Sequence, residues 1–289
     1  MKTQTLKIGE NGAVLTAYIQ NDAPRIKNSS CRPAVLVLPG GGYEFVSETE
    51  SEPVALAYAA AGFQAFTLEY SVGEKGAFPV PEREVVQALA LIRANAGKWH
   101  TDREKIALVG FSAGGHLAAS VGVHWIRKEL YSAVGERAEE GKPDALVLVY
   151  PCITAGEYGY PGIESVHGRD LTTEEKALLS VQNYVGAHTP PVYLCHTAED
   201  TCVPAMNSLL FAQALSKNKI PFELRIFKDG PHGMSLGTRA VRPSPESLPE
   251  ESRRLLADER IAAYLKRATA KFSAWLGESI AFLFDVFGI

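Results

Sequence analysis

One serine of this chain stands in a pattern that favours nucleophilic chemistry. Residues 110–115 read GFSAGG and follow the apolar run IALV, which indicates a buried strand, while a helical pattern begins just after Ser112. In a Gly-x-Ser-x-Gly turn between a strand and a helix, the flanking residues are small because Cβ atoms two residues from the serine would collide. The serine backbone is strained there, and the amide of Ala113 with the helix N-terminus can receive developing negative charge. The alternative is that Ser112 only caps the helix.

A serine hydroxyl needs a base to remove its proton and an acid to orient that base. In this type of turn, the acid and then the histidine follow the serine along the chain. Asp200 lies in the loop TAEDTCVP after the run PVYLCH, and His232 lies in the loop KDGPHGMS after the run FELRIF. Both loops would leave the carboxyl ends of strands, where parallel sheets bind their ligands. This order and placement predict a triad of Ser112, Asp200 and His232.

Other carboxylates and histidines compete for these roles. Glu199 adjoins Asp200 and could serve as the acid, although the shorter residue of the D-x-x-V-P turn is favoured. His116 lies inside the helix after the serine and is expected to pack or cap, whereas His196 ends a strand and could line the site or be structural. Four histidines have no partner pattern and are expected at the surface: His100, His124, His167 and His188. No HExxH, HxxxE or carboxylate cluster indicates a metal, and no cofactor is expected.

A glycine run offers further donors for negative charge. Residues 39–43 read PGGGY and follow the apolar run AVLVL. Consecutive glycines let backbone amides approach a substrate carbonyl without side chains in the way. A bare glycine run is also compatible with a loose turn or a phosphate cradle. The full phosphate motifs GxxxxGKS/T and GxGxxG are absent, so nucleotide binding is not expected.

The elements that must position these residues alternate between short apolar runs and helical patterns. Apolar strand candidates lie at residues 34–38, 64–70, 105–111, 145–150, 191–196 and 222–227. Helical spacing of apolar residues occupies residues 82–97, 203–217 and 258–277. This alternation predicts an α/β fold, a doubly wound, mostly parallel sheet with helices on both faces. Residues 6–20 are expected to add an antiparallel edge hairpin.

Three segments depart from this alternation. Residues 152–190 form a long polar excursion with one short helical pattern at 172–182, and they are predicted to be a small cap or lid insertion. Residues 237–257 are rich in Pro, Ser, Glu and Arg and are expected to form a solvated loop. The apolar tail, residues 280–289, either packs back on the domain, which is favoured, or is buried in a second subunit of a homo-oligomer. No composition shift divides the chain, so residues 1–289 are expected to form one domain.

Composition narrows the choice of partners. The chain has 289 residues, of which 46% are hydrophobic and 21% charged, and a formal net charge of −4 argues against nucleic acid or an anionic membrane as the main partner. The N-terminus shows no apolar signal region, and no long apolar run predicts a membrane span. Four cysteines without CxxC pairs are expected to be reduced. A cytoplasmic location is therefore expected.

In these motifs the chain resembles the α/β-hydrolase superfamily, specifically the acetyl esterase and carboxylesterase group with an HGGG-type loop. It is most similar to the bacterial esterases grouped with xylan-associated acetyl esterases. The resemblance covers about residues 30–235 and rests on PGGGY, GFSAGGHLA, HTAEDTCVP and GPHG in that order. It implies that Ser112 is the nucleophile, Asp200 the acid and His232 the base.

The same resemblance implies the donors of the oxyanion hole. The amides of Gly41 and Ala113 would hold the oxyanion, with Gly40 as a further candidate. Pro39 departs from the family pattern, because it replaces the histidine that commonly opens and organises the HGGG loop. The chemistry is expected to survive this change, while the geometry of the loop is left to the structure.

Together, these features predict a serine carboxylesterase acting on short-chain, acetyl esters through an acyl-enzyme. The polar 152–190 segment favours short acyl chains and a polar alcohol, and the resemblance adds an acetylated sugar or xylo-oligosaccharide as the small-molecule partner. Tyr43 and Tyr70 are the predicted substrate contacts, and three further aromatic residues could stack on a sugar: Trp99, Tyr158 and Tyr160. The alternatives are a small amidase, formamidase or peptidase using the same triad, and a catalytically silent hydrolase-like binding protein.

Overall fold

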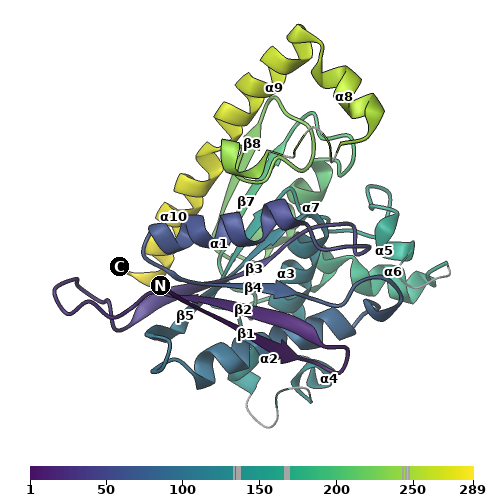
Figure 1. Ribbon diagram of the computed structural model, residues 1–289. Helices are drawn as coiled ribbons and strands as arrows, with labels where there is room; N and C mark the ends of the chain where they lie inside the picture. The colour runs from purple at the N-terminus through teal and green to yellow at the C-terminus, as the bar shows by residue number, and fades with distance from the viewer. Residues whose placement is uncertain (133, 135–137, 166–169, 243, 245, 247) are drawn as a thin grey trace.

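A computed structural model describes residues 1–132, 134, 138–165, 170–242, 244, 246 and 248–289 (Figure 1). Within this part of the chain the strands are β1 (Lys2–Ile8), β2 (Ala13–Ile19), β3 (Arg32–Leu38), β4 (Gln64–Glu69), β5 (Thr101–Phe111), β6 (Ala145–Val149), β7 (Val192–Thr197) and β8 (Phe222–Phe227). They form one sheet in the order β1-β2-β4-β3-β5-β6-β7-β8. Neighbouring strands from β4 through β3 to β8 are parallel, and β2 is antiparallel to both of its neighbours. The predicted doubly wound, mostly parallel sheet is confirmed.

Strand ends differ most from the prediction where the sequence is polar. The edge hairpin begins at Lys2 rather than at residue 6, and β5 begins at Thr101 rather than at residue 105. The early residues of both strands are largely exposed and polar. A prediction based on apolar runs therefore places the first residue of these strands too far along the chain.

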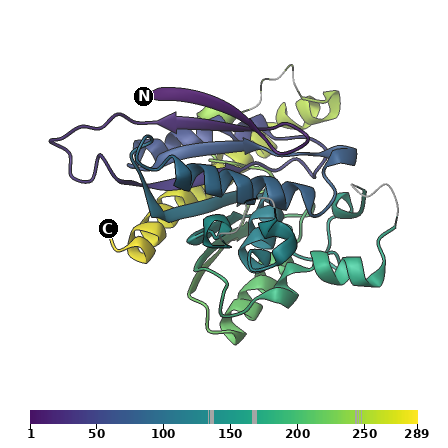
Figure 2. The ribbon, with the colours of Figure 1, turned by 90° about the horizontal axis from the view of Figure 1, so that it is seen from below.

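Helices cover both faces of the sheet, and side chains alternate between them (Figures 1 and 2). One face carries α1 (Glu52–Ala60) and α10 (Ala274–Phe287), and the other carries α2 (Val80–Ala94), α3 (Ser112–His124) and α7 (Met206–Lys217). Val35 and Val37 of β3 belong to the core under α1 and α10, whereas Leu36 and Leu38 belong to the core under α2 and α3. Parallel strands buried on both faces need such continuous apolar runs. Smaller elements connect these: α4 (Lys128–Tyr131) and 3-10 turns at Glu48–Glu50, Gly73–Lys75 and Ala138–Gly141.

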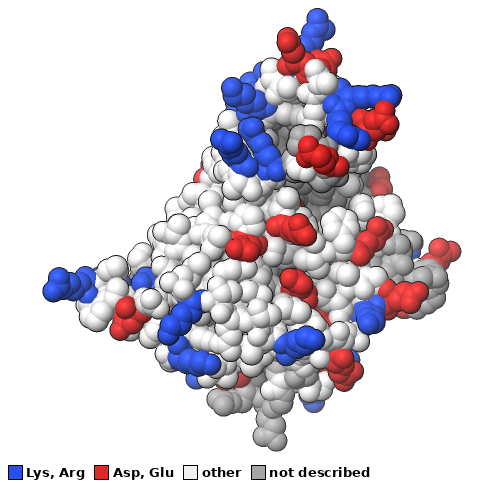
Figure 3. All heavy atoms as spheres, viewed as in Figure 1, with Lys and Arg blue, Asp and Glu red and all other residues white. Residues whose placement is uncertain are grey.

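The C-terminal region is more helical than predicted. The expected helix at residues 258–277 is two helices, α9 (Glu259–Phe272) and α10, separated at Ser273. The expected loop at residues 237–257 contains a 3-10 turn, Arg239–Val241, and α8 (Glu250–Leu256), so that prediction is wrong in this part. The α8 sequence EESRRLL places acids in the first turn and arginines in the last, which suits the helix dipole. Helices α8 and α9 project from the sheet and carry charges of both signs (Figures 1 and 3).

The apolar tail packs on its own chain. Leu283 is fully buried, Phe282 and Phe287 are nearly so, and Phe284 stacks on Phe63 with ring centroids 5.4 Å apart. These contacts agree with the favoured alternative, in which the tail returns to the domain. Self-association through this segment stays a prediction.

The long excursion at residues 152–190 contributes short helices beside the carboxyl edge of the sheet. They are α5 (Gly162–Ser165), α6 (Thr173–Leu179) and a 3-10 turn, Val181–Tyr184. Helix α6 begins with a capping box, in which Thr172 bonds the Glu175 amide and Glu175 bonds the Thr172 amide. Movement of this segment as a lid stays a prediction. None of the helices described is both long enough and apolar enough to cross a membrane.

Candidate active site

Ser112 lies in a strained turn between β5 and α3. Its φ angle is 51°, in the left-handed region that residues with a Cβ rarely adopt. A Cβ on Gly114 would lie 2.1 Å from the carbonyl oxygen of Leu38, and a Cβ on Gly110 would lie 2.3 Å from the carbonyl oxygen of Gly114. The small residues of the motif are therefore required where α3 crosses the sheet. The helix-cap alternative does not hold, because Phe111 occupies the cap position and no side chain caps the helix there.

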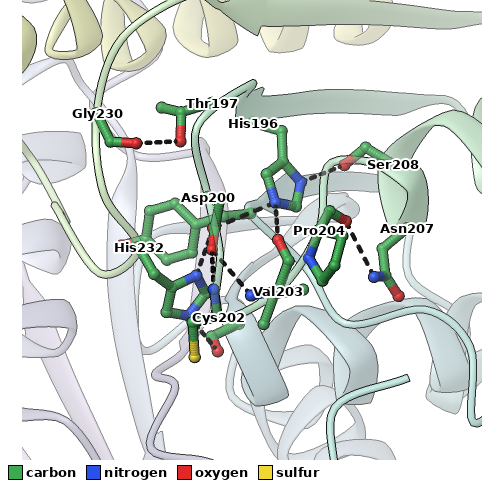
Figure 4. A network of polar contacts seen from close by, with 12 residues as sticks. His196, Thr197, Asp200, Cys202, Val203, Pro204, Asn207, Ser208, Gly230 and His232 are labelled. Atoms are coloured by element: carbon green, nitrogen blue, oxygen red, sulfur yellow. Dashed lines mark hydrogen bonds and ion pairs between the residues drawn. The ribbon is translucent and has the colours of Figure 1, made fainter. Parts of the chain in front are cut away.

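The structure brings the three predicted triad residues together. The imidazole Nε2 of His232 lies 2.8 Å from Oγ of Ser112, and its Nδ1 lies 2.6 Å from Oδ2 of Asp200. Figure 4 shows the His232–Asp200 pair between the loops that follow β7 and β8. An ionised carboxylate only accepts hydrogen bonds, so Nδ1 carries the proton and Nε2 accepts the serine hydroxyl. This is the tautomer that a general base for Ser112 requires.

The surroundings of Asp200 keep its carboxyl group ionised. Its Oδ1 accepts the amides of Cys202 at 3.0 Å and Val203 at 2.8 Å, and its Oδ2 also lies 3.3 Å from Nε2 of His196. Burial raises the pKa of this carboxyl. The hydrogen bonds from His196, His232 and the Val203 amide outweigh burial and hold the pKa well below its usual range. A negative charge is therefore held next to the imidazole.

His196 is a second histidine next to the carboxylate of Asp200 (Figure 4). It is fully buried, its Nε2 lies 2.8 Å from the carbonyl oxygen of Val203, and its Nδ1 lies 2.9 Å from the hydroxyl of Ser208. A carbonyl oxygen only accepts, so Nε2 carries the proton and also points it toward Asp200. Of the two roles left open by the sequence, the structure places His196 in the supporting one.

The carboxylate of Glu199 has partners other than the His232 imidazole. One of its carboxylate oxygens accepts the Tyr264 hydroxyl and, at 3.2 Å, the amide of Gly230. The geometry therefore favours Asp200 over Glu199 as the partner of His232.

The two predicted oxyanion donors come from different segments, Gly41 from the glycine loop and Ala113 from the turn at the serine. Gly41 has a φ angle of 128°, and a Cβ there would lie 2.0 Å from the carbonyl oxygen of Phe45. In the part of the chain that the structure describes, the amides of Gly41 and Ala113 donate to no protein acceptor. The amide of Gly40, in contrast, donates to Oε2 of Glu50 at 2.8 Å. Gly40 is therefore corrected from a candidate oxyanion donor to an anchor of the loop.

Tyr43 and Tyr70 are also corrected, from predicted substrate contacts to supports of this loop. Only 6% and 3% of their surfaces are exposed. The Tyr70 hydroxyl donates to the carbonyl oxygen of Pro39 at 2.6 Å, and the Tyr43 hydroxyl lies 2.8 Å from Nδ1 of His116. Their hydroxyls are hydrogen-bonded inside the protein, and neither residue is among those that line the pocket beside Ser112. Tyr70 thereby holds the loop at the residue that departs from the family pattern.

The other sequence candidates belong mostly to the core. Trp99 is buried against Phe66. His124 was expected at the surface, but it is buried beside Tyr184, and burial lowers its pKa to about 4. His100 and His188 are partly buried, and His167 lies outside the described residues. The surface prediction failed for His124 because nothing local in the sequence reveals packing by a distant segment.

A pocket of about 230 Å³ opens at the serine. Its lining includes Gly41, Ser112, His232, Tyr160, Cys202 and Phe45. Phe45 is 61% exposed, and Tyr160 lies against Gly42. Sequence reasoning missed Phe45, although its place directly after the glycine loop was an available signal.

The strained serine between β5 and α3, with a histidine and an aspartate on loops after β8 and β7, defines the chain as an α/β hydrolase. The chain belongs to the BD-FAE family, whose model matches residues 23–215. Endo-1,4-beta-xylanase B of Butyrivibrio fibrisolvens is 36% identical over 227 residues, which are 77% of this chain and 34% of that protein. The acetylxylan esterase of Xylanibacter ruminicola is 26% identical over 245 residues, 82% of this chain and 47% of that protein. The chain thus spans about a third and about half of these two relatives.

Solved structures of similar chains agree with this assignment. An acetyl ester-xyloside bifunctional hydrolase from Caldicellulosiruptor lactoaceticus superposes with a TM-score of 0.71 and 33% identity, covering 94% of this chain and 89% of that one. The carboxylesterase Cest-2923 from Lactobacillus plantarum superposes with a TM-score of 0.74 and 25% identity, covering 90% of this chain and 98% of that one. The chain is therefore related to carboxylic ester hydrolases.

Proposed function

We propose that this protein is a carboxylic ester hydrolase that works through an acyl-enzyme on Ser112. One observation carries the proposal: Asp200, His232 and Ser112 form a continuous hydrogen-bonded series with bonds of 2.6 and 2.8 Å. Among the described residues, the amides of Gly41 and Ala113 have no protein acceptor. Ester hydrolysis needs a nucleophile, a base and oxyanion donors in this arrangement.

The proposed steps use only these groups. Nε2 of His232 takes the hydroxyl proton as Oγ of Ser112 attacks the acyl carbon, and the amides of Gly41 and Ala113 hold the oxyanion. The imidazolium, stabilised by ionised Asp200, then protonates the leaving alcohol. Water activated by His232 attacks the acyl-enzyme and releases the acid, which returns the serine.

Short acyl chains, acetyl above all, on a sugar or xylo-oligosaccharide are the proposed substrates. Two relatives support this choice by name, an acetylxylan esterase and an acetyl ester-xyloside hydrolase. The pocket adds support, because the exposed ring of Phe45 and Tyr160 offer aromatic surface at the serine on which a sugar could stack.

The test of the reaction is the Ser112→Ala variant with p-nitrophenyl acetate. Turnover should fall on the order of 10⁶-fold, because the nucleophile is lost while the fold is kept. Ser216→Ala, an exposed serine of α7, should keep the wild-type rate. Wild-type protein should also react with a fluorophosphonate probe, and Ser112→Ala should not. A folded Ser112→Ala sample with undiminished turnover contradicts the mechanism, and an unlabelled wild type indicates a silent binding protein.

The test of the substrate is a panel of esters and amides. Acetate release from acetylated xylo-oligosaccharides should exceed cleavage of butyryl and octanoyl esters and of the matching anilides. A preference for the octanoyl ester contradicts the short-chain proposal, and a preference for the anilide indicates an amidase.

A further inference from the structure

A second buried carboxylate, outside the triad, lies beside the site. Glu50 ends the 3-10 turn Glu48–Glu50 and is 4% exposed. Its Oε2 accepts the amide of Gly40 at 2.8 Å, and its Oε1 accepts the hydroxyl of Tyr150 at 2.7 Å. A buried carboxylate is costly unless hydrogen bonds satisfy it, and both of its oxygens are bonded here.

Tyr150 connects this carboxylate to the histidine loop. It follows β6 with a φ angle of 38° and is 1% exposed. Its hydroxyl donates to Glu50 and accepts the amide of Ser235 at 2.8 Å, and its ring packs edge-on against His232 with centroids 4.9 Å apart. Ser235, three residues after the histidine, also has a positive φ angle of 49°. Strained residues persist only where their surroundings hold them.

A further bond closes the network. The hydroxyl of Ser235 donates to the carbonyl oxygen of Thr49 at 2.6 Å, next to Glu50 in the chain. The glycine loop, the end of β6 and the histidine loop therefore meet at Glu50, Tyr150 and Ser235, which we call the Glu50 network.

We propose that Glu50 is a positioning residue that fixes the oxyanion loop and the catalytic histidine in place relative to each other. By accepting the Gly40 amide it fixes the peptide before Gly41, whose own amide is left for the substrate oxyanion. By accepting the Tyr150 hydroxyl it fixes the ring against which His232 packs. The inference rests on the proposed ester hydrolysis, because both groups it positions act in that reaction.

A positioning role and a merely stabilising role differ in what they change. Oxyanion donors and the base act on the transition state, so their displacement lowers kcat and leaves KM nearly constant. Replacing a residue that only stabilises the fold lowers the free energy of unfolding and leaves kcat of the folded enzyme unchanged. Two matched sites elsewhere in the chain make the comparison: buried Glu84, bonded to the Ser71 amide at 2.7 Å, and buried Tyr58, bonded to Ser279 at 2.7 Å.

The experiment compares Glu50→Gln, Tyr150→Phe and their double variant with the controls Glu84→Gln and Tyr58→Phe. With p-nitrophenyl acetate, Glu50→Gln should lower kcat by about 10- to 100-fold with little change in KM, since small misplacements of catalytic groups have effects of this size. Tyr150→Phe should also lower kcat, and the double variant should lose much less than the product of the single losses, because both belong to one network. The controls should keep the wild-type kcat even where their unfolding midpoints fall.

If the wild type is active and both Glu50→Gln and Tyr150→Phe fold and keep the wild-type kcat, the positioning role is overturned. The proposal of ester hydrolysis is not affected by that result. If Glu50→Gln does not fold, Tyr150→Phe decides, because it keeps the carboxylate and removes one hydroxyl. A wild type that neither hydrolyses esters nor reacts with a fluorophosphonate overturns both proposals.

Discussion

At the scale of single residues, the site depends on a carboxylate that stays ionised beside an imidazole. Asp200 is buried, yet two backbone amides and two histidines direct hydrogen-bond donors at it. This concentration of donors makes the anion stable where burial alone would favour the neutral acid. Glu199, its neighbour in sequence, accepts bonds from Tyr264 and Gly230 instead.

The two neighbouring acids should therefore respond differently to the same change. Asp200→Asn removes the charge and offers His232 an amide donor that favours the wrong tautomer, so kcat/KM should fall on the order of 10⁴-fold. Glu199→Gln should have little effect, because its amide oxygen can still accept from Gly230. Steady-state kinetics of both variants check this, and equal losses would show that the acid has been misassigned.

At the scale of elements, glycine is required where α3 meets the sheet and is dispensable in α10. Gly114 has no room for a Cβ, since the carbonyl oxygens of Leu38 and Pro39 would lie 2.1 and 2.3 Å from it. Gly277 is exposed within α10, and a Cβ there would meet nothing within 4 Å. The crossing of β3 and α3 that aims Ser112 therefore depends on a missing side chain.

The same substitution at these two glycines should have opposite effects. Gly114→Ala should lower the free energy of unfolding by about 1–3 kcal/mol and reduce turnover, because helix and strand must separate. Gly277→Ala should raise it by about 0.5–1 kcal/mol, the usual gain of alanine over glycine within a helix, and leave turnover unchanged. Urea unfolding measures both effects. A Gly114→Ala protein as stable as the wild type would mean that the crossing is looser than described.

At the scale of the whole molecule, the sheet buries ionisable groups under the helices on one face. Glu82 of α2 is 2% exposed, and its Oε1 accepts the Ser120 hydroxyl of α3 at 2.9 Å. Its Oε2 has no hydrogen-bond partner among the described residues. Burial, together with the nearby charge of Glu84, raises the pKa of Glu82 to about 7.

This raised pKa predicts the sign of a pH effect on global stability. The ordinary pKa of a glutamate is 4.5, so between about pH 4.5 and pH 7 the unfolded chain loses the Glu82 proton while the folded protein keeps it. The unfolded state then binds fewer protons, and the wild type loses stability as the pH rises through this window. Glu82→Gln lacks this loss and should gain up to about 3 kcal/mol relative to the wild type from pH 4.5 to pH 7.

Urea unfolding of Glu82→Gln and the wild type at a series of pH values measures this difference. Taking the difference removes the contributions of other buried groups, such as His116 and His124, which both proteins share. A stability difference that stays constant with pH would contradict the raised pKa of Glu82.

The sequence by itself determined the fold class, the apolar runs that form the parallel strands, and the choice of Ser112, Asp200 and His232, which the structure brings within hydrogen-bond distance. These features are local: an apolar run marks a buried strand, and small residues around Ser112 mark the strand-to-helix crossing. The fixed chain order of this fold then assigns Asp200 and His232 to loops at the same edge. The break between α9 and α10 at Ser273 was missed because apolar periodicity continues through it. Helix α8 was missed because its sequence is too polar to show an apolar periodicity.

Only the tertiary structure decided which neighbouring groups are free and which are occupied. Gly40 and Gly41 are adjacent and alike in sequence, yet the Gly40 amide donates to Glu50, whereas the Gly41 amide has no acceptor among the described residues. Tyr43 was expected to meet the substrate but is bonded to His116, 73 positions away along the chain. The physical reason is that hydrogen bonding and burial depend on distances between segments remote in sequence, and those distances exist only once the sheet has brought the loops to one edge.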